Sequence, residues 1–276
     1  MRIGAPAKLN LCLFLGRRRD DGLHELCSLF EPLALADTVM VTETDRDEVI
    51  CAGVEGENLA ARALTALRKN GWNSPPLRIE IEKRIPVAAG LGGGSADAAA
   101  VLRLAEGAVG NLDAVAAELG ADVPSQLLPA LSLVRGAGER VERLPTPASH
   151  AVLLLPGGGG LSTAAVFAEA DRLGLGRDED ELQAFAPRLR EAAGAGASPL
   201  EYAELLANDL EPAAISLRPD IGDALDALRE ASAPLTFLTG SGPTAIGLFP
   251  TLAAAKSAAA RIDRDDAIVC EAGTTQ

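Results

Sequence analysis

The feature that most constrains the fold is a run of small residues at positions 86–96, with the sequence PVAAGLGGGSA. Its four glycines stand between an alternating segment at 77–82, which predicts a strand, and an apolar stripe at 95–108, which predicts a helix. Glycine lets the backbone adopt positive φ and lets N–H groups approach an anion closely. Since the first N–H groups of a helix are unpaired and lie at the positive end of its dipole, this layout predicts a phosphate cradle.

We predict that this loop holds the phosphates of a nucleotide through Pro86, Val87, Ala88, Ala89, Gly90, Leu91, Gly92, Gly93, Gly94, Ser95 and Ala96. The structural alternative is a tight glycine turn with Ser95 as the N-cap of the helix, and the strand and helix on either side favour phosphate binding over it. Two better-known phosphate loops do not fit. No Lys follows the glycines as in GxxxxGK[ST], and Ser95 takes the place of the last glycine of GxGxxG.

Composition limits the class of partner. The formal net charge of −14 argues against general nucleic-acid binding, which depends on Lys and Arg at phosphates. No apolar stretch approaches the roughly 20 residues that span a bilayer, and the N-terminus lacks a signal-peptide pattern. The cysteines form no CxxC pair, and His24 and His150 are far apart. We therefore expect reduced thiols, no protein-held metal site, and a cytoplasmic protein that acts on a small molecule.

The first apolar segment, residues 7–15, alternates with a period of two and predicts a strand. Lys8 and Asn10 begin one face of this strand, which places an amine and an amide side by side. The other face is expected to pack inward and consists of Leu9, Leu11, Leu13 and Leu15.

The order of the remaining elements predicts an α+β fold with two lobes. Before the PTPAS segment at 145–149 we expect β structure at 26–43 and helices at 58–69, at 111–119 and from Pro124 onward. After it we expect a strand at 151–156, a strand–turn–strand at 236–249, a further strand at 267–272, and helices at 163–173, 180–193, 200–206, 221–231 and 251–261. The length allows one large or two medium domains.

Two glycine-rich segments resemble signatures of the GHMP kinases, the superfamily named for galactokinase, homoserine kinase, mevalonate kinase and phosphomevalonate kinase. PxxxGLGGGSAxAAA resembles the second signature, which binds ATP phosphates in that superfamily. LTGSGPTAIGLF, with Gly240, Ser241 and Gly242, resembles the third, although alone it is more typical of a Gly-Pro hairpin. The resemblance implies two lobes, at 1–147 and 148–276, with the active site in the cleft between them.

Within the superfamily, PAKLNLCL, DDGLHEL, GADVP, STAAVF and LANDLE resemble segments of the 4-diphosphocytidyl-2-C-methyl-D-erythritol kinases, in the same order. The resemblance implies ATP-dependent phosphorylation of the substrate 2-hydroxyl in the non-mevalonate route to isoprenoid precursors, with Mg²⁺ accompanying ATP. Lys8 and Asp122 would be the catalytic pair. Asn10, His24 and Thr163 would bind the substrate, His24 at the cytosine and Thr163 at the phosphates. We expect a monomer or a homodimer.

Alternatives remain open at this stage. Lys8 alone is typical of a solvated surface lysine, and Asp122 of a helix N-cap. Leu23 and Ser125 stand where the family usually has aromatic residues about the cytosine, and Pro129-Ala130 replaces a Gly-Gly pair. These departures leave two other hypotheses, a GHMP kinase for another alcohol or polyol and an inactive GHMP-fold binding module.

Overall fold

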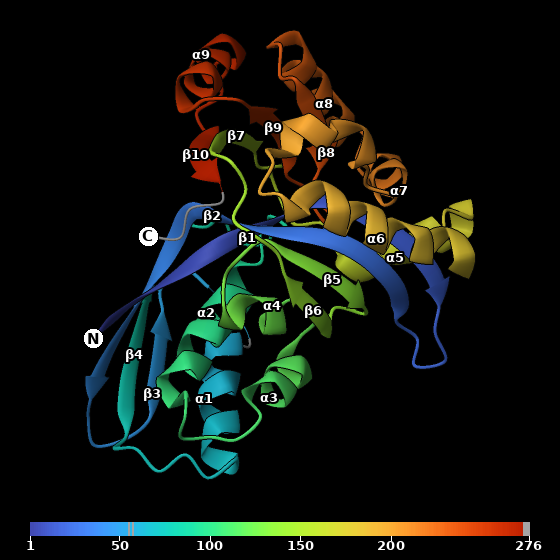
Figure 1. Ribbon diagram of the computed structural model, residues 1–276. Helices are drawn as coiled ribbons and strands as arrows, with labels where there is room; N and C mark the ends of the chain where they lie inside the picture. Colours follow the sequence, from blue (N-terminus) through green and yellow to red (C-terminus); the bar gives the residue numbers. More distant parts are fainter. Residues whose placement is uncertain (55, 57, 273–276) are drawn as a thin grey trace.

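The computed structural model describes residues 1–54, 56 and 58–272 (Figure 1). The segment before residue 145 contains β1 (Arg2–Arg18), β2 (His24–Glu43), β3 (Glu48–Cys51), α1 (Leu59–Lys69), β4 (Leu77–Glu82), α2 (Gly93–Leu102), the 3₁₀ turn η1 (Arg103–Ala105), α3 (Leu112–Leu119), α4 (Val123–Leu127), β5 (Ser132–Gly136) and β6 (Arg140–Arg143). The rest contains β7 (His150–Leu155), α5 (Thr163–Leu173), α6 (Glu179–Gly194), the 3₁₀ segment η2 (Pro199–Leu205), α7 (Glu211–Leu217), α8 (Asp220–Glu230), β8 (Leu235–Leu238), β9 (Ala245–Phe249), α9 (Leu252–Ile262) and β10 (Ile268–Ala272).

The strands form two sheets that meet at one point. The long strand β2 pairs antiparallel with β1, β4 and β5, and β3 and β6 extend the edges of this first sheet. In the second sheet β7 pairs with β9 and β10, and β9 pairs with β8. The two sheets are joined where Ala272 of β10 pairs with Leu33 of β2. The last strand of the chain therefore ties its second half back to its first.

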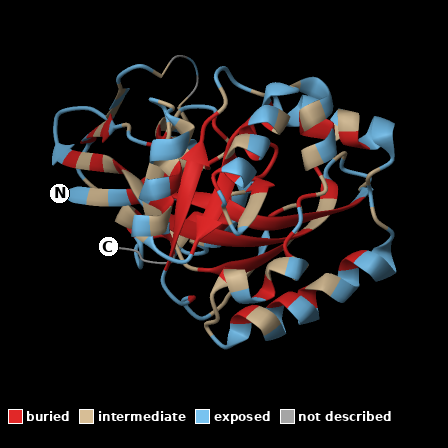
Figure 2. Cartoon of the chain, turned by 90° about the horizontal axis from the view of Figure 1, so that it is seen from above, coloured by how far each residue is buried: buried red, intermediate tan, exposed pale blue. Residues whose placement is uncertain are grey.

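Helices pack on the two sheets, and the middles of the long strands form the interior of the molecule, whereas β3, β6 and alternate residues of β4 are partly exposed (Figures 1 and 2). In Figure 1, α1 to α4 lie below the first sheet and α7 to α9 surround the second. Helix α6 packs on β1 and β2 through Leu182, Ala186 and Leu189, which share a core with Leu9 and Leu29. A helix from the second half thus covers the first sheet. The predicted α+β architecture is confirmed, and the boundary at 147/148 stays a prediction.

Most predicted elements are present, with three informative differences. The helix predicted at 95–108 begins two residues earlier, at Gly93, and ends at Leu102. The segment at 200–206 is a 3₁₀ helix that is kinked at Tyr202. The short elements β3, β5, β6 and α7 were not predicted, because four to seven residues carry too little periodicity to read. All four cysteines are free thiols, as expected.

The predicted single leucine face of the first strand is wrong, because β1 contains bulges. Its register against β2 shifts between Pro6 and Lys8 and again between Asn10 and Cys12. A shift of one residue moves the following side chains to the opposite face. Leu9 and Leu11 therefore lie in the core under α6 together with Cys12 and Phe14. The second core, beneath α5, α7 and α8, receives Leu13 and Leu15.

Both faces of β1 are covered in its middle, which bears on the polar residues there. Residues from Ala7 to Gly16 are buried without interruption, including Lys8 and Asn10. Burying a charged amine is costly unless it is paired and hydrogen-bonded. The partners of Lys8 therefore identify where the molecule places its chemistry. Within the described residues, no helix is both long enough and apolar enough to cross a membrane.

Candidate active site

Lys8 lies on β1 beside the first bulge, and Lys8 Nζ donates to Asn10 Oδ1 at 2.7 Å. The same ammonium lies 4.6 Å from the centre of the Phe30 ring, a cation–π contact. Asn10 is fixed in turn, since its Nδ2 donates to Ser28 Oγ (2.9 Å) and its backbone N–H donates to Thr239 Oγ1 (2.8 Å). The structure therefore does not place Lys8 on the surface. It holds the amine at a defined point, with its side chain only 7% exposed.

Asp122 completes this arrangement. Its Oδ2 lies 3.2 Å from Lys8 Nζ, and its side chain is 31% exposed, so one partner is buried and the other faces the cavity. Asp122 does occupy the N-cap position of α4, yet its carboxylate makes no capping hydrogen bond to the described backbone. The two halves of the predicted catalytic pair are thus brought together, and the capping alternative for Asp122 is not supported.

The glycine loop ends in an uncapped helix. Gly92 occupies the N-cap position of α2 with φ of +68°, and the first helical bond runs from Ala96 N to Gly92 O (2.9 Å). Ser95 is therefore not the N-cap, which contradicts the structural alternative. The N–H groups of Gly93, Gly94 and Ser95 precede that first bond, so they have no acceptor within the helix. Three consecutive donors at the positive end of a dipole fit an anion.

Close packing explains the glycines at two positions of this loop. A Cβ on Gly92 would lie 2.8 Å from Lys8 Cγ, and a Cβ on Gly90 would lie 2.5 Å from the carbonyl oxygen of Gly242. Both residues also have positive φ, which L side chains rarely adopt. The Lys8 backbone N–H donates to Leu91 O at 2.9 Å. The loop is thus fastened to the strand that carries Lys8.

The second glycine-rich segment packs directly on the first. Thr244 Oγ1 donates to Ala89 O at 2.7 Å, and Gly242 touches Gly90. Asn208, in the LANDLE segment, donates from Nδ2 to the carbonyls of Leu238 (2.6 Å) and Gly240 (2.7 Å) and so fixes the turn. Ser241 Oγ lies 3.0 Å from Thr163 Oγ1 at the start of α5. Segments 150 residues apart in the chain therefore line one wall of the same cleft.

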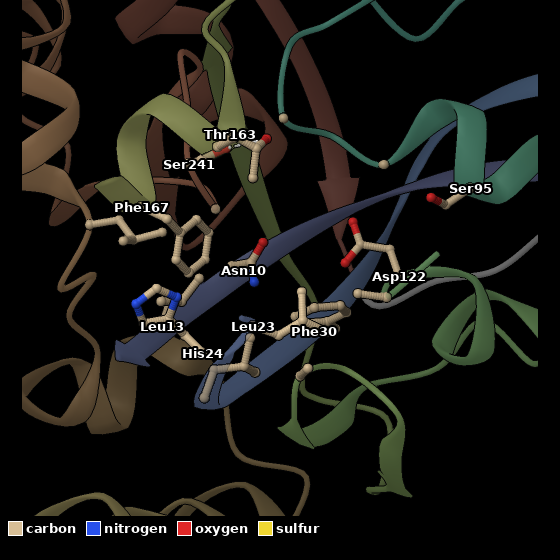
Figure 3. A pocket seen from close by; sticks show the side chains of 18 of the residues that line it. Asn10, Leu13, Leu23, His24, Phe30, Ser95, Asp122, Thr163, Phe167 and Ser241 are labelled. Atoms are coloured by element: carbon tan, nitrogen blue, oxygen red, sulfur yellow. Dashed lines mark hydrogen bonds between the residues drawn. The ribbon is translucent and has the colours of Figure 1, made fainter. Parts of the chain in front are cut away.

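Two cavities meet at the loop. One, of about 680 Å³, extends from Lys8 and Asp122 to His24 and Phe167 (Figure 3). The other, of about 450 Å³, lies against residues 86–95 on the far side of the loop. The residues that line both are Gly90, Gly92, Ser95 and Thr163. Two molecules bound on either side would therefore approach one another at the free N–H groups, beside Lys8 and Asp122.

A buried ion network lies at the edge of the second cavity. Lys83 bridges two carboxylates, with an ion pair to Asp37 and a contact of 2.8 Å between its Nζ and Asp97 Oδ2. The other oxygen, Asp97 Oδ1, is buried and has no hydrogen-bond partner in the described part of the chain. Burial raises the pKa of Asp97 to about 6, although Lys83 acts in the opposite direction. Neither Lys83 nor Asp97 was a predicted site residue.

The far end of the first cavity is built differently. His24 Nε2 donates to Asp171 Oδ1 at 2.7 Å, and the His24 ring lies 5.1 Å from that of Phe167. Leu23, beside it, is 54% exposed. Figure 3 shows these side chains at one end of the cavity and Asp122 and Ser95 at the other, with Asn10 between them. The predicted residues Asn10, His24 and Thr163 thus all line this cavity.

The interpretation of Ser125 as part of this wall is wrong. Ser125 lies inside α4, is buried, and donates its hydroxyl to Asp122 O at 2.7 Å. The phenyl ring beside His24 in the cavity belongs instead to Phe167 on α5, whereas Phe30 lies at the Lys8 end. Its segment, STAAVF, was noted in the sequence, but periodicity alone did not show which side of α5 faces the cavity. Other residues of the site were also missed and are Phe30, Ser28, Thr239, Asn208 and Asp171.

Comparisons with known proteins agree with this geometry. The family descriptions "GHMP kinases N terminal domain" and "GHMP kinases C terminal" match residues 58–128 and 189–267. A protein of Mycolicibacterium gilvum called 4-diphosphocytidyl-2-C-methyl-D-erythritol kinase is 41% identical over 271 residues, which cover 92% of this chain and 83% of the relative. A protein of the same name from Streptomyces avermitilis is 38% identical over 255 residues, covering 88% and 85% of the two chains.

Solved structures give the same result. A crystal structure of 4-(cytidine 5′-diphospho)-2C-methyl-D-erythritol kinase superposes with a TM-score of 0.81, at 33% identity and with full coverage of both chains. A homoserine kinase from Cytophaga hutchinsonii shares the fold, with a TM-score of 0.66 at 19% identity over 100% of this chain and 94% of the other. The chain therefore belongs to the 4-diphosphocytidyl-2-C-methyl-D-erythritol kinase family of GHMP kinases.

Proposed function

We propose that this ATP-dependent kinase transfers the γ-phosphoryl group of ATP to the 2-hydroxyl of 4-diphosphocytidyl-2-C-methyl-D-erythritol. The observation that carries the proposal is the meeting of two cavities at a loop with three free N–H groups, directly beside the Lys8–Asp122 pair. Phosphoryl transfer requires alignment of the two reactants and stabilisation of charge more than covalent chemistry by the protein. The geometry supplies both at one point.

In this proposal Asp122 accepts the proton of the attacking hydroxyl. The oxygen forms a bond to the γ-phosphorus while the bond from phosphorus to the bridging oxygen of ATP breaks, and ADP leaves with that electron pair. Lys8 Nζ already donates to Asn10 Oδ1 and contacts Asp122, and an ammonium has three N–H groups. The third is free to contact the transferring group. The buried Asn10 and Phe30 keep the ammonium in that position.

The nucleotide would occupy the cavity of about 450 Å³, with its phosphates at the N–H groups of Gly93, Gly94 and Ser95. The absence of a Cβ at Gly92 leaves the backbone open to such an approach. Mg²⁺ accompanies ATP in this proposal and neutralises the phosphate charge. The Ser95 hydroxyl lines both cavities and offers an oxygen ligand of the kind that Mg²⁺ prefers.

The base of the substrate would lie at the far end of the larger cavity. Phe167 offers an aromatic face, and His24 is held beside it by Asp171. Leu23 would cover the opposite face with an apolar surface smaller than a ring. Thr163 and Ser241, between the two ends, would contact the substrate diphosphate.

The test is an ADP-release assay with matched alcohol substrates. Turnover is expected with 4-diphosphocytidyl-2-C-methyl-D-erythritol and not with 2-C-methyl-D-erythritol 4-phosphate, which lacks the cytidine. Asp122→Asn should lower turnover by about 10²–10⁴ while ATP affinity remains. The exposed Leu23 favours a second candidate function, that of a related kinase for a base-free alcohol. Faster turnover of the base-free alcohol would establish that second function, and turnover of neither would favour the binding module.

A further inference from the structure

A second hollow, away from the reacting groups, is lined by arginines. This arginine groove has a volume of about 590 Å³ and lies between the ends of β1 and β2, the β5–β6 hairpin and helix α6. Its charged residues are Arg17, Arg18, Arg19, Arg135, Arg140, Arg190, Glu25 and Glu179. Six arginines against two glutamates form a concentrated positive site on a chain with a net charge of −14. Nothing in the proposed kinase reaction uses these residues beyond Arg18 at the border of the cleft.

The arginines divide into two kinds. Arg140 pairs with Glu25, and Arg190 binds Glu142 through two hydrogen bonds of 2.6 and 2.7 Å. Arg17 and Arg135, by contrast, make no hydrogen bond or ion pair with any described residue, and the Nε of Arg135 is buried. A buried donor without a partner costs free energy. A ligand that accepts a hydrogen bond from it therefore gains more binding free energy than a ligand bound to an exposed arginine.

The surroundings of Arg135 suit an anion. Arg135 on β5 lies opposite Cys27 on β2 and opposite Arg140 on β6, so two guanidinium groups share one end of the sheet. Cys27 forms the floor of the groove and stays neutral, because burial raises the pKa of its thiol to about 11. The floor therefore adds no negative charge beneath the arginines.

We propose that the arginine groove binds a small diphosphate-bearing anion through Arg17 and Arg135. The planar guanidinium fork matches phosphate oxygens. Arg19, Arg140 and Arg190 are paired with carboxylates, which leaves Arg17, Arg18 and Arg135 as the groove arginines without a carboxylate partner among the described residues. Two phosphate groups together carry about three to four negative charges at neutral pH and offer enough oxygens to accept from these guanidinium groups. The volume falls in the usual range for small-molecule sites. This proposal does not depend on which alcohol the kinase phosphorylates.

The groove also borders the substrate cleft. Arg18 and Leu26 line both hollows, and Leu23 in the turn between β1 and β2 and His24 at the start of β2 lie on the cleft side. An anion held by Arg17 would therefore lie at the base of the turn that contacts the substrate. We expect its binding to change the KM for the base-containing substrate more than kcat, since the reacting groups lie at the other end of the cleft.

Isothermal titration calorimetry with inorganic diphosphate tests the site. The titration uses the full chain without Mg²⁺, with the nucleotide cavity saturated by a non-hydrolysable ATP analogue. We expect saturable binding of diphosphate to the wild type. The affinity should be lower by about tenfold or more in Arg17→Gln and in Arg135→Gln, because each substitution removes a charge-assisted contact. Neither residue lines the substrate cleft, so a loss of diphosphate binding in these two variants reports on the groove and not on the active site.

Arg46→Gln is the matched control, because Arg46 is exposed in a turn of the first sheet and does not line the groove. It should bind within twofold of the wild type. Arg17 is exposed, so Arg17→Gln decides the outcome if Arg135→Gln unfolds at a lower temperature. The proposal is overturned by no heat in the wild type, by unchanged affinity in Arg17→Gln, by an equal loss in Arg46→Gln, or by tighter binding of a short RNA oligonucleotide through the same arginines.

Discussion

The two ends of the substrate cleft are built on different principles. At the phosphate end, Lys8, Asn10 and Ser28 are buried, and each is held by named hydrogen bonds from more than one element. At the base end, Leu23 is 54% exposed and Asp171, the partner of His24, is also largely open. The phosphate end is a buried, hydrogen-bonded network, and the base end is an exposed surface with an apolar lining.

This difference determines which substitutions each end tolerates. A change at the phosphate end disturbs several partners at once, since Asn10 alone links Lys8, Ser28 and Thr239. A change at the base end alters one contact with the substrate and little else. The departure at Leu23 can therefore alter affinity while the chemistry of transfer stays intact.

The largest effect is expected from the catalytic pair. Lys8→Met keeps most of the buried volume, and Asp122→Asn keeps the shape of the side chain, so both variants should fold. Each should lower kcat by about 10²–10⁴, the usual contribution of a positioned proton acceptor and its partner. The double variant should be little slower than either single one, because the two side chains act as a unit. Steady-state ADP release measures kcat for the three variants. If the loss in the double variant equals the product of the two single losses, the two side chains act independently.

The second effect concerns the glycine loop. Gly92→Ala forces a side chain into positive φ, at a cost of roughly 1–2 kcal/mol, and places its Cβ 2.8 Å from Lys8 Cγ. ATP should bind about tenfold more weakly, since the phosphate N–H groups and Lys8 must both shift. Gly71→Ala is the matched control, because Gly71 has φ of +82° and open space around it.

Chemical denaturation and ATP titration together separate strain from binding. Both variants should lose stability through the positive φ, Gly92→Ala somewhat more because of its contact with Lys8, and only Gly92→Ala should lose ATP affinity. Gly93 is a poorer position for this test, because a Cβ there already lies 3.1 Å from Ile85 Cγ2 in the core beneath the loop. Equal ATP affinity in the Gly92 and Gly71 variants would mean that the loop does not hold the phosphates.

A smaller effect is expected at the base end. Leu23→Tyr should lower the KM for the cytidine substrate by about tenfold, within the range of roughly 1–3 kcal/mol for a base stacked on an aromatic ring. The kcat should change little, because a contact with a remote base is equal in the ground and transition states. Leu128→Tyr, at a position 63% exposed outside the cleft, controls for the added ring itself. A large drop in kcat for Leu23→Tyr would show that the two ends are coupled.

The sequence allowed most of the phosphate end to be predicted, because its signals are local. The strand, the glycines and the helix follow one another within residues 77–102, and their chemistry follows from their order. The start of α2 was misplaced by two residues, since Gly93 and Gly94 have low intrinsic helix propensity and tertiary contacts decide their conformation. The pairing of Lys8 with Asp122 came from the resemblance and not from periodicity.

The base end could be predicted less well, because it depends on packing between distant elements. Helix α5 was predicted at its observed position, yet only the packing of α5 against α7 shows that Phe167 faces the cavity. Ser125 was misread because the family resemblance implied a place about the base, whereas its hydroxyl donates to Asp122 O within α4. The bulge between Asn10 and Cys12 was equally hidden, since the leucines alternate without interruption through this register shift.

The smallest effect on turnover is expected from Asp97, whose protonation changes the free energy of unfolding with pH. Burial raises the pKa of Asp97 at the phosphate end to about 6, above its ordinary value of 3.8. A folded-state pKa that is raised means that the folded protein binds this proton more tightly than the unfolded chain does. The stabilisation by this proton is therefore complete below about pH 4 and is lost as the pH rises through 6. Asp97→Asn keeps an oxygen for Lys83 and removes the titration. The free energy of unfolding, measured by urea denaturation from pH 4 to pH 8, should therefore fall less steeply in Asp97→Asn than in the wild type. Parallel curves for wild type and Asp97→Asn would show that the phosphate end does not hold a destabilised carboxylate.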